Sequence, residues 1–419
     1  MTPKLLTTLK TYSWRAFWPD AVAGVTVAMV ALPLSFAIAI ASGADPAKGL
    51  ITAIVGGFLI SALGGSRVQI GGPTGAFIVV VFSVISEHGY DGLVLATLMA
   101  GVILLIAGAF HAGRLIAFIP EAVINGFTIG IAIIIATSQL PDLFGLTGRE
   151  VPAEFIPKLA ALWEMRSTAS LPVFAIGGGS MVLIVVFRRL WPRFPGLIVA
   201  VALSSAAVAV LSLPVDTISD RFGALPRGLP RPQMPEVSLA RLVELLPSAL
   251  IIAFLAGVES LLSAIVADRM IEGRHRPNAE LLAQGAANVG SALFAGLPAT
   301  GAIARTATNV RAGGRTPVAG IVHAFTVLVV MVVAAPLAGR LAMPALAGLL
   351  LITAWNMSEP DKWRGYWRAP RSDRVLLFLT LILTVVADLT VAIGVGVVLG
   401  LLLRLKRTDT PDDWTPRDV

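Results

Sequence analysis

The sequence predicts an all-α polytopic membrane protein with fourteen membrane-spanning segments, arranged as two seven-segment repeats of opposite orientation. Three observations lead to this fold class. The 419 residues are 56% hydrophobic and only 14% charged, whereas a soluble domain carries about 25% charged residues. Apolar runs recur from Asp20 to Arg404. An irregular Pro and Thr-Gly-Ala motif occupies the same position in each half of the chain.

Composition also excludes several classes of function. The net charge of +7 fits the basic cytoplasmic loops of membrane proteins better than nucleic-acid binding, because no RNA- or DNA-binding motif accompanies it. Cysteine is absent, which excludes disulfides and Cys-ligated zinc. We expect no metal and no cofactor. The basic N-terminus leads into a full span without a small-residue cleavage site, so no signal peptide is predicted.

The first repeat covers residues 1–213, and charged, Pro and Gly residues bound its apolar runs. Two flanking stretches, 5–18 and 152–165, mix apolar and charged residues and are predicted to be helices along the membrane interface. The predicted spans 1–7 lie near residues 21–41, 49–63, 74–87, 92–110, 115–139, 171–187 and 196–213.

A Pro- and Arg-rich linker, 214–240, separates the two halves. The second repeat covers 241–404, and 405–419 form a polar tail. Seven spans per repeat force the two copies into opposite orientations, as in many secondary transporters. The predicted spans 8–14 lie near residues 245–267, 280–295, 302–311, 316–338, 342–356, 375–388 and 389–403.

An even number of spans places both termini on one side of the membrane. That side receives more than twice as many Lys and Arg residues as the other. The positive-inside rule therefore predicts that both termini are cytoplasmic.

Spans 3 and 10 are irregular. The first contains Gly72-Pro73-Thr74-Gly75-Ala76 and the second Pro298-Ala299-Thr300-Gly301-Ala302. Pro and Gly interrupt helices, so we expect an extended stretch before a half-helix in each span, with Pro73 in a first helical turn and Thr300 as an N-cap. Each half-helix start carries unpaired N–H groups and about +0.5 charge, so two facing starts form an anion site. Ordinary Gly/Pro kinks are the alternative.

Two charged residues lie within predicted spans. Arg305 follows the second half-helix start, and a charge at the bilayer centre costs about 2.5–3.5 kcal/mol, so we expect Arg305 to bind the anion. Glu259, with Ser263, is the candidate for coupling to a proton or a sodium ion; a purely structural ion pair of Glu259 with Arg305 is the alternative. The candidate anion-binding residues are Arg305, Gly72, Pro73, Thr74, Gly75, Gly301, Ala302, Ala304, Leu34 and Ile38.

Motifs of energy coupling and hydrolysis are missing from the sequence. G-x-x-x-x-G-K-[ST] is absent, and so are H-E-x-x-H and G-x-S-x-G. We therefore expect a protein that is not an enzyme, either a secondary transporter or a channel.

Three stretches resemble the sulfate permease (SulP) anion transporter family: 278–288 (NAELLAQGAAN), 294–301 (FAGLPATG) and 313–320 (GGRTPVAG). The resemblance implies a uracil-permease-like fold, with a core domain of spans 1–4 and 8–11 and a gate domain of spans 5–7 and 12–14. It further implies transport by movement of core against gate, a homodimer in the lipid bilayer, and a place in the bacterial cytoplasmic membrane.

The chain departs from the resembled family in two ways. Members usually continue into a cytoplasmic STAS domain, which this chain lacks, and we interpret the chain as a truncated form. Many members have Gln or Glu after the Pro of span 1, where this chain has Leu34.

The expected function is proton-coupled symport of a small dianion, such as the C4-dicarboxylate fumarate. Two half-helix starts and Arg305 offer about +2, a match for a dianion when Glu259 is protonated. The alternatives are sodium-coupled transport of bicarbonate or sulfate, and an anion channel. Sulfate, bicarbonate and C4-dicarboxylates are all substrates within the resembled family.

Overall fold

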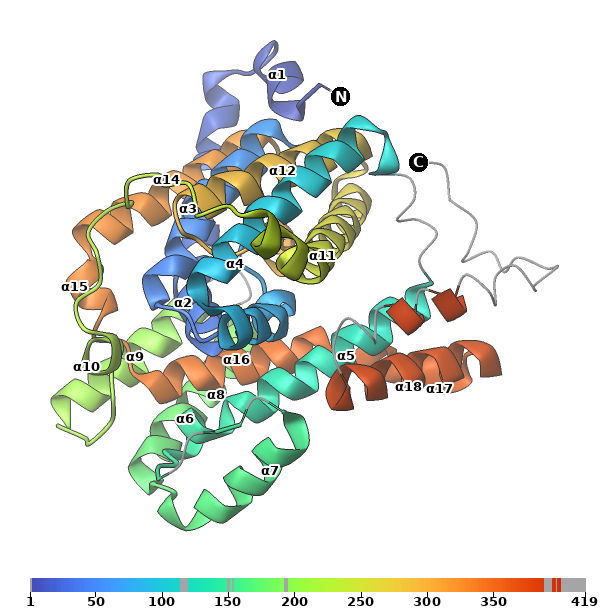
Figure 1. The fold of residues 1–419 in the computed structure, drawn as a ribbon. Coiled ribbons are helices and arrows are strands. Elements are labelled where there is room, and N and C mark those ends of the chain that lie inside the picture. Colours follow the sequence, from blue (N-terminus) through green and yellow to red (C-terminus); the bar gives the residue numbers. More distant parts are fainter. Residues whose placement is uncertain are drawn as a thin grey trace.

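Helices account for most of the chain in the computed structural model, which describes residues 2–113, 120–148, 151–152, 154–191, 195–387, 394–396 and 398–400. The strands of the described part are two short ones that pair with each other. Figure 1 shows the helices in two groups, one around α2, α3, α4, α11, α12 and α14, and the other around α5, α8, α16 and α18.

The first group contains the two interrupted spans. α2 packs against α14 and α11 against α4, while α3 and α12 pack against each other. The elements of this group are α1 (Lys4–Leu9), α2 (Trp14–Ala41), α3 (Pro46–Leu63), β1 (Gly71–Gly72), η1 (Gly75–Phe77), α4 (Ile78–Ala109), α11 (Leu239–Ile271), α12 (Pro277–Leu293), β2 (Thr300–Gly301), α13 (Ile303–Arg311) and α14 (Pro317–Val333).

The second group is built around two further helix pairs, α18 with α5 and α16 with α8. Its longer helices are accompanied by several short ones. The elements are α5 (Glu121–Ser138), α6 (Leu140–Phe144), α7 (Phe155–Glu164), η3 (Met165–Thr168), α8 (Leu171–Leu190), α9 (Gly196–Val210), α15 (Ala335–Ala338), α16 (Met343–Met357), η4 (Pro360–Lys362), α17 (Trp363–Arg368) and α18 (Arg371–Val386).

The packing repeats itself between the two halves of the chain. Span 1 packs against span 11 as span 8 packs against span 4, and span 6 against span 12 as span 13 against span 5. In each pair of contacts, every span of one repeat is replaced by the corresponding span of the other repeat. This is the pattern expected for two copies of one unit. The division into a moving core and gate stays a prediction.

Six helical segments of the described part are long and apolar enough to cross a membrane: Trp14–Ala41, Pro46–Leu63, Gly75–Ala109, Glu121–Phe144, Leu171–Leu190 and Leu239–Ile271. The predicted division between spans 3 and 4 is confirmed, because two helices meet at Gly89, whose backbone is not helical (φ 71°, ψ 179°), within the segment Ile78–Ala109. The predicted break between them is therefore a single residue, and glycine suits it because the backbone there has positive φ.

Other predicted boundaries differ from the structure or lie outside the described residues. The predicted interfacial helix 5–18 is divided, since α1 ends at Leu9 and Trp14 already begins the helix of span 1. Span 14 and the tail 405–419 lie largely outside the described residues, of which 394–396 and 398–400 are helical. The second interfacial prediction, 152–165, contains the helix α7.

The linker runs over the outside of the molecule from α10 (Ile218–Phe222) past α15 and α14 to α11 (Figure 1). A capping box of Thr217 and Asp220 begins α10. Leu225 and Pro226 then line a small apolar cavity with residues of α14 and α15. Phe36, Ala47 and Leu50 of the first repeat line the same cavity, so the linker packs against both repeats.

Candidate anion site

The two interrupted spans meet where their extended stretches pair. β1 and β2 are antiparallel, with Gly71 opposite Gly301 and Gly72 opposite Thr300. The N–H of Ala302 extends the pairing by donating to the carbonyl of Ile70 at 2.8 Å. All of these residues are buried. The pairing satisfies backbone groups that would be costly to leave unpaired inside a membrane.

The first half-helix begins directly after β1. Thr74 is its N-cap, with extended backbone angles (φ −126°, ψ 159°), and η1 leads into α4. The prediction that Pro73 lies in the first helical turn is wrong, because the extended stretch continues through Pro73, whose carbonyl accepts a hydrogen bond from Arg305. A first helical turn has N–H groups without intrahelical acceptors, here those of Gly75 and Ala76.

The second half-helix is α13, and its N-cap is Ala302. The prediction that Thr300 caps this helix is wrong, because strand pairing holds Thr300 in β2. The Thr300 hydroxyl donates instead to the carbonyl of Ala256 on α11, at 2.9 Å. The N–H groups at the start of α13 belong to Ile303 and Ala304, both of which are exposed.

Arg305 lies between the two half-helix starts and is only 1% exposed. Its Nη2 donates to the Pro73 carbonyl at 2.8 Å and lies 3.5 Å from Ser35 Oγ. Its Nε and Nη1 are buried without any hydrogen-bond partner, and among the described residues no carboxylate forms an ion pair with it. An uncompensated buried charge is expensive, so this arrangement favours an anion as the missing partner.

Glu259 is partly exposed and accepts a hydrogen bond from the Thr74 hydroxyl at 2.8 Å. Among the described residues, Glu259 and Arg305 do not form the structural ion pair that was the alternative. Ser263, one turn further along α11, is buried with its hydroxyl 3.3 Å from Thr306 Oγ1 on α13. The predicted coupling residues therefore contact one half-helix each.

Three glycines allow close approach at the site. A Cβ added to Gly72, which has φ +149°, would overlap Arg305 Nη1, and one added to Gly301 would overlap the carboxamide of Gln69. At Gly75 the added atom would lie 2.8 Å from Met357 Sδ on α16. Larger side chains at these positions would therefore displace the residues that surround the site.

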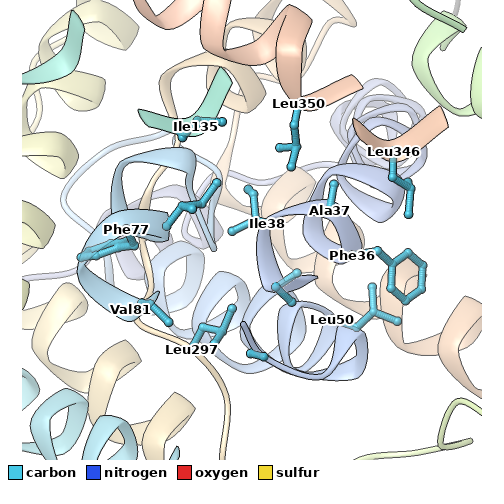
Figure 2. Close-up of a cluster of buried hydrophobic side chains, with 14 of the residues drawn as sticks. Phe36, Ala37, Ile38, Leu50, Phe77, Val81, Ile135, Leu297, Leu346 and Leu350 are labelled. Atoms are coloured by element: carbon cyan, nitrogen blue, oxygen red, sulfur yellow. The ribbon is translucent and has the colours of Figure 1, made fainter. Parts of the chain in front are cut away.

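Leu34 and Ile38 belong to the apolar boundary of the site. Figure 2 shows Ile38 among Phe77, Ile135 and Leu350, where α2 and η1 face α5 and α16. Leu34 packs against the same cluster while remaining partly exposed. Contact between these two residues and the anion stays a prediction.

Sequence reasoning did not assign a role to the polar residues that surround the crossing strands. Gln69 precedes β1, and Glu280, Gln284 and Asn288 lie on α12; all four are buried. The stretch 278–288 served only for the resemblance, although Glu280, Gln284 and Asn288 recur at i, i+4 and i+8 and so share one helix face. That spacing was the signal available in the sequence.

Comparison with known proteins gives consistent matches. The model of the sulfate permease family matches residues 17–380. A putative sulfate transporter of Bacillus subtilis, YvdB, is 41% identical over 400 residues, covering 95% of this chain and 75% of that protein. The bicarbonate transporter BicA of a Synechocystis strain is 32% identical, covering 93% of this chain and 70% of that protein.

Solved structures show the same fold. The transmembrane domain of a cyanobacterial bicarbonate transporter, BicA, matches with a TM-score of 0.80 and 29% identity, covering 93% of this chain and 98% of that one. The structure of SLC26A9 matches with a TM-score of 0.87, covering 97% of this chain and 68% of that one. At 18% identity the second match concerns the fold alone.

Proposed function

The chain belongs to the sulfate permease family, and from this premise we propose that it is a secondary active transporter that carries a small dianion in symport with a proton. The fold is that of a polytopic membrane protein with two inverted seven-segment repeats. Anion transport is the activity for which its relatives are named. Substrate and coupling ion are the finer parts of the proposal.

The observation that carries the proposal is the buried guanidinium of Arg305. Two of its nitrogens lack partners although the group is almost completely enclosed. The strands that precede η1 and α13 pair with each other, and each helix start carries positive partial charge. A small anion would satisfy the unpaired donors of the side chain and of the backbone together.

The amount of charge favours a dianion. The two half-helix starts contribute roughly +1 together, and Arg305 adds one more. A protonated Glu259 leaves about +2, whereas an ionised Glu259 leaves about +1. A dianion and a proton should therefore bind cooperatively, which is symport in thermodynamic terms.

Sulfate and C4-dicarboxylates such as fumarate both fit the dianion class. Sulfate gains support from YvdB, which is named a putative sulfate transporter. Fumarate would present two carboxylates, one to Arg305 and one to a half-helix start. The two substrates need the same charge at the site and differ in length, so one uptake experiment can compare them.

The test is uptake of labelled fumarate and labelled sulfate by proteoliposomes that contain the full chain, under an inward proton gradient and without sodium. We expect saturable accumulation of at least one dianion that collapses when the gradient is dissipated. Saturation of the rate and accumulation above equilibrium separate a carrier from a channel, which would only conduct anions down their gradient. Uptake that ignores the proton gradient contradicts the coupling proposed here.

Sodium-coupled bicarbonate transport is the second candidate. Oxygen atoms of Glu259 and Thr74 lie 2.8 Å apart, and those of Ser263 and Thr306 lie 3.3 Å apart, a set of hard ligands suited to a small cation. The relatives named bicarbonate transporters support this candidate. A strict requirement for sodium in the same proteoliposomes, with bicarbonate as the transported anion, would select it over the proton symport.

A further inference from the structure

One face of α12 carries four buried polar residues: Glu280, Gln284, Asn288 and Ser291. Their spacing of four, four and three residues places them along one side of the helix. All four side chains are completely buried. Buried polar residues are costly unless they are hydrogen-bonded, so their partners show what this face holds in place.

Glu280 holds the segment that precedes β1. Its Oε2 accepts from the N–H groups of Gly65 and Ser66 at 2.9 and 3.2 Å. Its Oε1 accepts from the Ser260 hydroxyl at 3.0 Å and from Gln284 Nε2 at 2.9 Å. The carboxylate therefore ties the end of span 2 to α11, next to Glu259.

Gln69 completes this connection. Its Nε2 donates to the hydroxyl and to the carbonyl of Ser260, at 2.9 and 3.0 Å. The same carboxamide lies directly against Gly301 of β2. The chain before the first half-helix is thus held by side chains of α11 and α12 as well as by its pairing with β2.

Asn288 holds the segment that precedes β2. Its Oδ1 accepts from the N–H of Ala299 at 2.9 Å, and its Nδ2 donates to the carbonyl of the same residue at 2.8 Å. Ser291 Oγ donates to the carbonyl of Leu297 at 2.6 Å. The Asn288 carboxamide therefore pairs with both backbone groups of Ala299, as a neighbouring strand would.

We propose that α12 is the template of the anion site, with Glu280 and Asn288 as positioning residues that fix the two half-helix starts relative to each other. The pairing of β1 and β2 covers only two residues per strand, so it gives little restraint by itself. Binding by backbone N–H groups needs them held close to their productive geometry. This inference rests on the proposed anion transport and adds residues that do not touch the anion.

The sharpest test compares two asparagines of the same helix. Asn288→Ala removes both hydrogen bonds to Ala299, whereas Asn278→Ala removes a bond from the N–H of Gly113 to Asn278 Oδ1 at the helix start. Both variants of the full chain are reconstituted, and KM and turnover for the transported dianion are measured together with the melting temperature in detergent.

We expect Asn288→Ala to raise KM about tenfold, the effect of leaving one buried pair of backbone groups without partners. Asn278→Ala should change KM by less than about twofold. Asn288→Asp keeps the acceptor for the Ala299 N–H and should give a smaller rise in KM than Asn288→Ala. This second variant also keeps the inference testable if Asn288→Ala does not fold.

Equal KM values for the wild type, Asn278→Ala and Asn288→Ala would overturn the inference, whatever the melting temperatures. If Asn288→Ala does not fold, equal KM values for the wild type and Asn288→Asp would overturn it. A fall in melting temperature with unchanged KM would assign α12 a purely structural role and overturn it as well. Failure of the proposed function is a separate result, because the wild type itself would then show no saturable anion uptake.

Discussion

The two half-helix starts share a sequence motif but differ in where the helix begins within it and in side-chain chemistry. Each begins after a two-residue strand, and each contains Thr-Gly-Ala, at 74–76 and at 300–302. The strands pair with each other, so the two starts lie beside a common crossing point. Duplication of one unit explains this agreement, since the backbone path is what both copies need for an anion site.

The shared Thr caps the first half-helix but lies in β2 before the second, so the motif is offset between the two starts. Their side chains differ at positions that correspond through the motif. Five residues after the shared Thr, the first start has Val79 and the second has Arg305. The first Thr hydroxyl donates to Glu259, and the second to the backbone of Ala256. The comparison indicates that the two starts have different roles. The second start supplies the charge for the anion, and the first contacts Glu259, the residue proposed to carry the cation.

Loss of the charge at the second start should have the largest effect. Arg305→Ala should lower kcat/KM for the dianion by roughly 100-fold, because hydrogen bonds to a buried charged group are the strong ones. The matched variant Val79→Ala, at the position that corresponds to Arg305 in the shared motif, should transport within about threefold of wild type. Uptake assays on protein that elutes as a folded species test both. Unchanged affinity and rate in Arg305→Ala would contradict the assignment.

The shared glycines should differ in the effect of an added methyl group. Gly301→Ala would press against Gln69, which hydrogen bonds hold to Ser260, and should cost about 1–3 kcal/mol of stability or a corresponding loss of affinity. Gly75→Ala meets the flexible side chain of Met357 and should cost less. Melting temperature and KM measure the difference. Normal transport by Gly301→Val would show that the half-helix model is wrong.

Substitution of Glu259 tests whether this residue carries the coupling proton. Glu259→Gln should keep exchange of the dianion across the membrane and lose accumulation driven by a lower external pH, because the amide cannot carry a proton. In the wild type, lowering the external pH should increase accumulation. Counterflow with labelled and unlabelled dianion provides the control for an intact anion site. Persistent pH-driven accumulation in Glu259→Gln would exclude this residue as the proton carrier.

Substitution of Thr74 or Thr300 should change transport least, and the two variants should differ in the pH dependence of uptake. Thr74→Ala removes the hydroxyl that donates to Glu259, and should move the midpoint of pH-driven uptake upward by roughly one pH unit or less. Thr300→Ala removes a bond to a backbone carbonyl and should lower the melting temperature without moving that midpoint. Equal pH profiles for both variants would remove the proposed difference between the two starts.

Much of the fold was predictable because it depends on local features of the chain. Long apolar runs bounded by charge indicate membrane segments, and Pro and Gly within a span indicate an interrupted helix. Arg305 stood out because a charge is rare in an apolar run. The exact helix starts were not predictable, since Pro73 and Thr300 suit a helix start but are held extended by contacts with the other repeat.

The sequence by itself determined the membrane class, the repeated motif and the buried arginine, since these follow from composition and from the spacing of neighbouring residues. Only the tertiary structure decided the partners. It places Arg305 against the Pro73 carbonyl, Glu259 against Thr74, and Asn288 against Ala299. The first two of these pairs join residues of different repeats. Local propensity contains no information about such pairings, because they are selected by the need to satisfy buried polar groups once the two repeats have packed together.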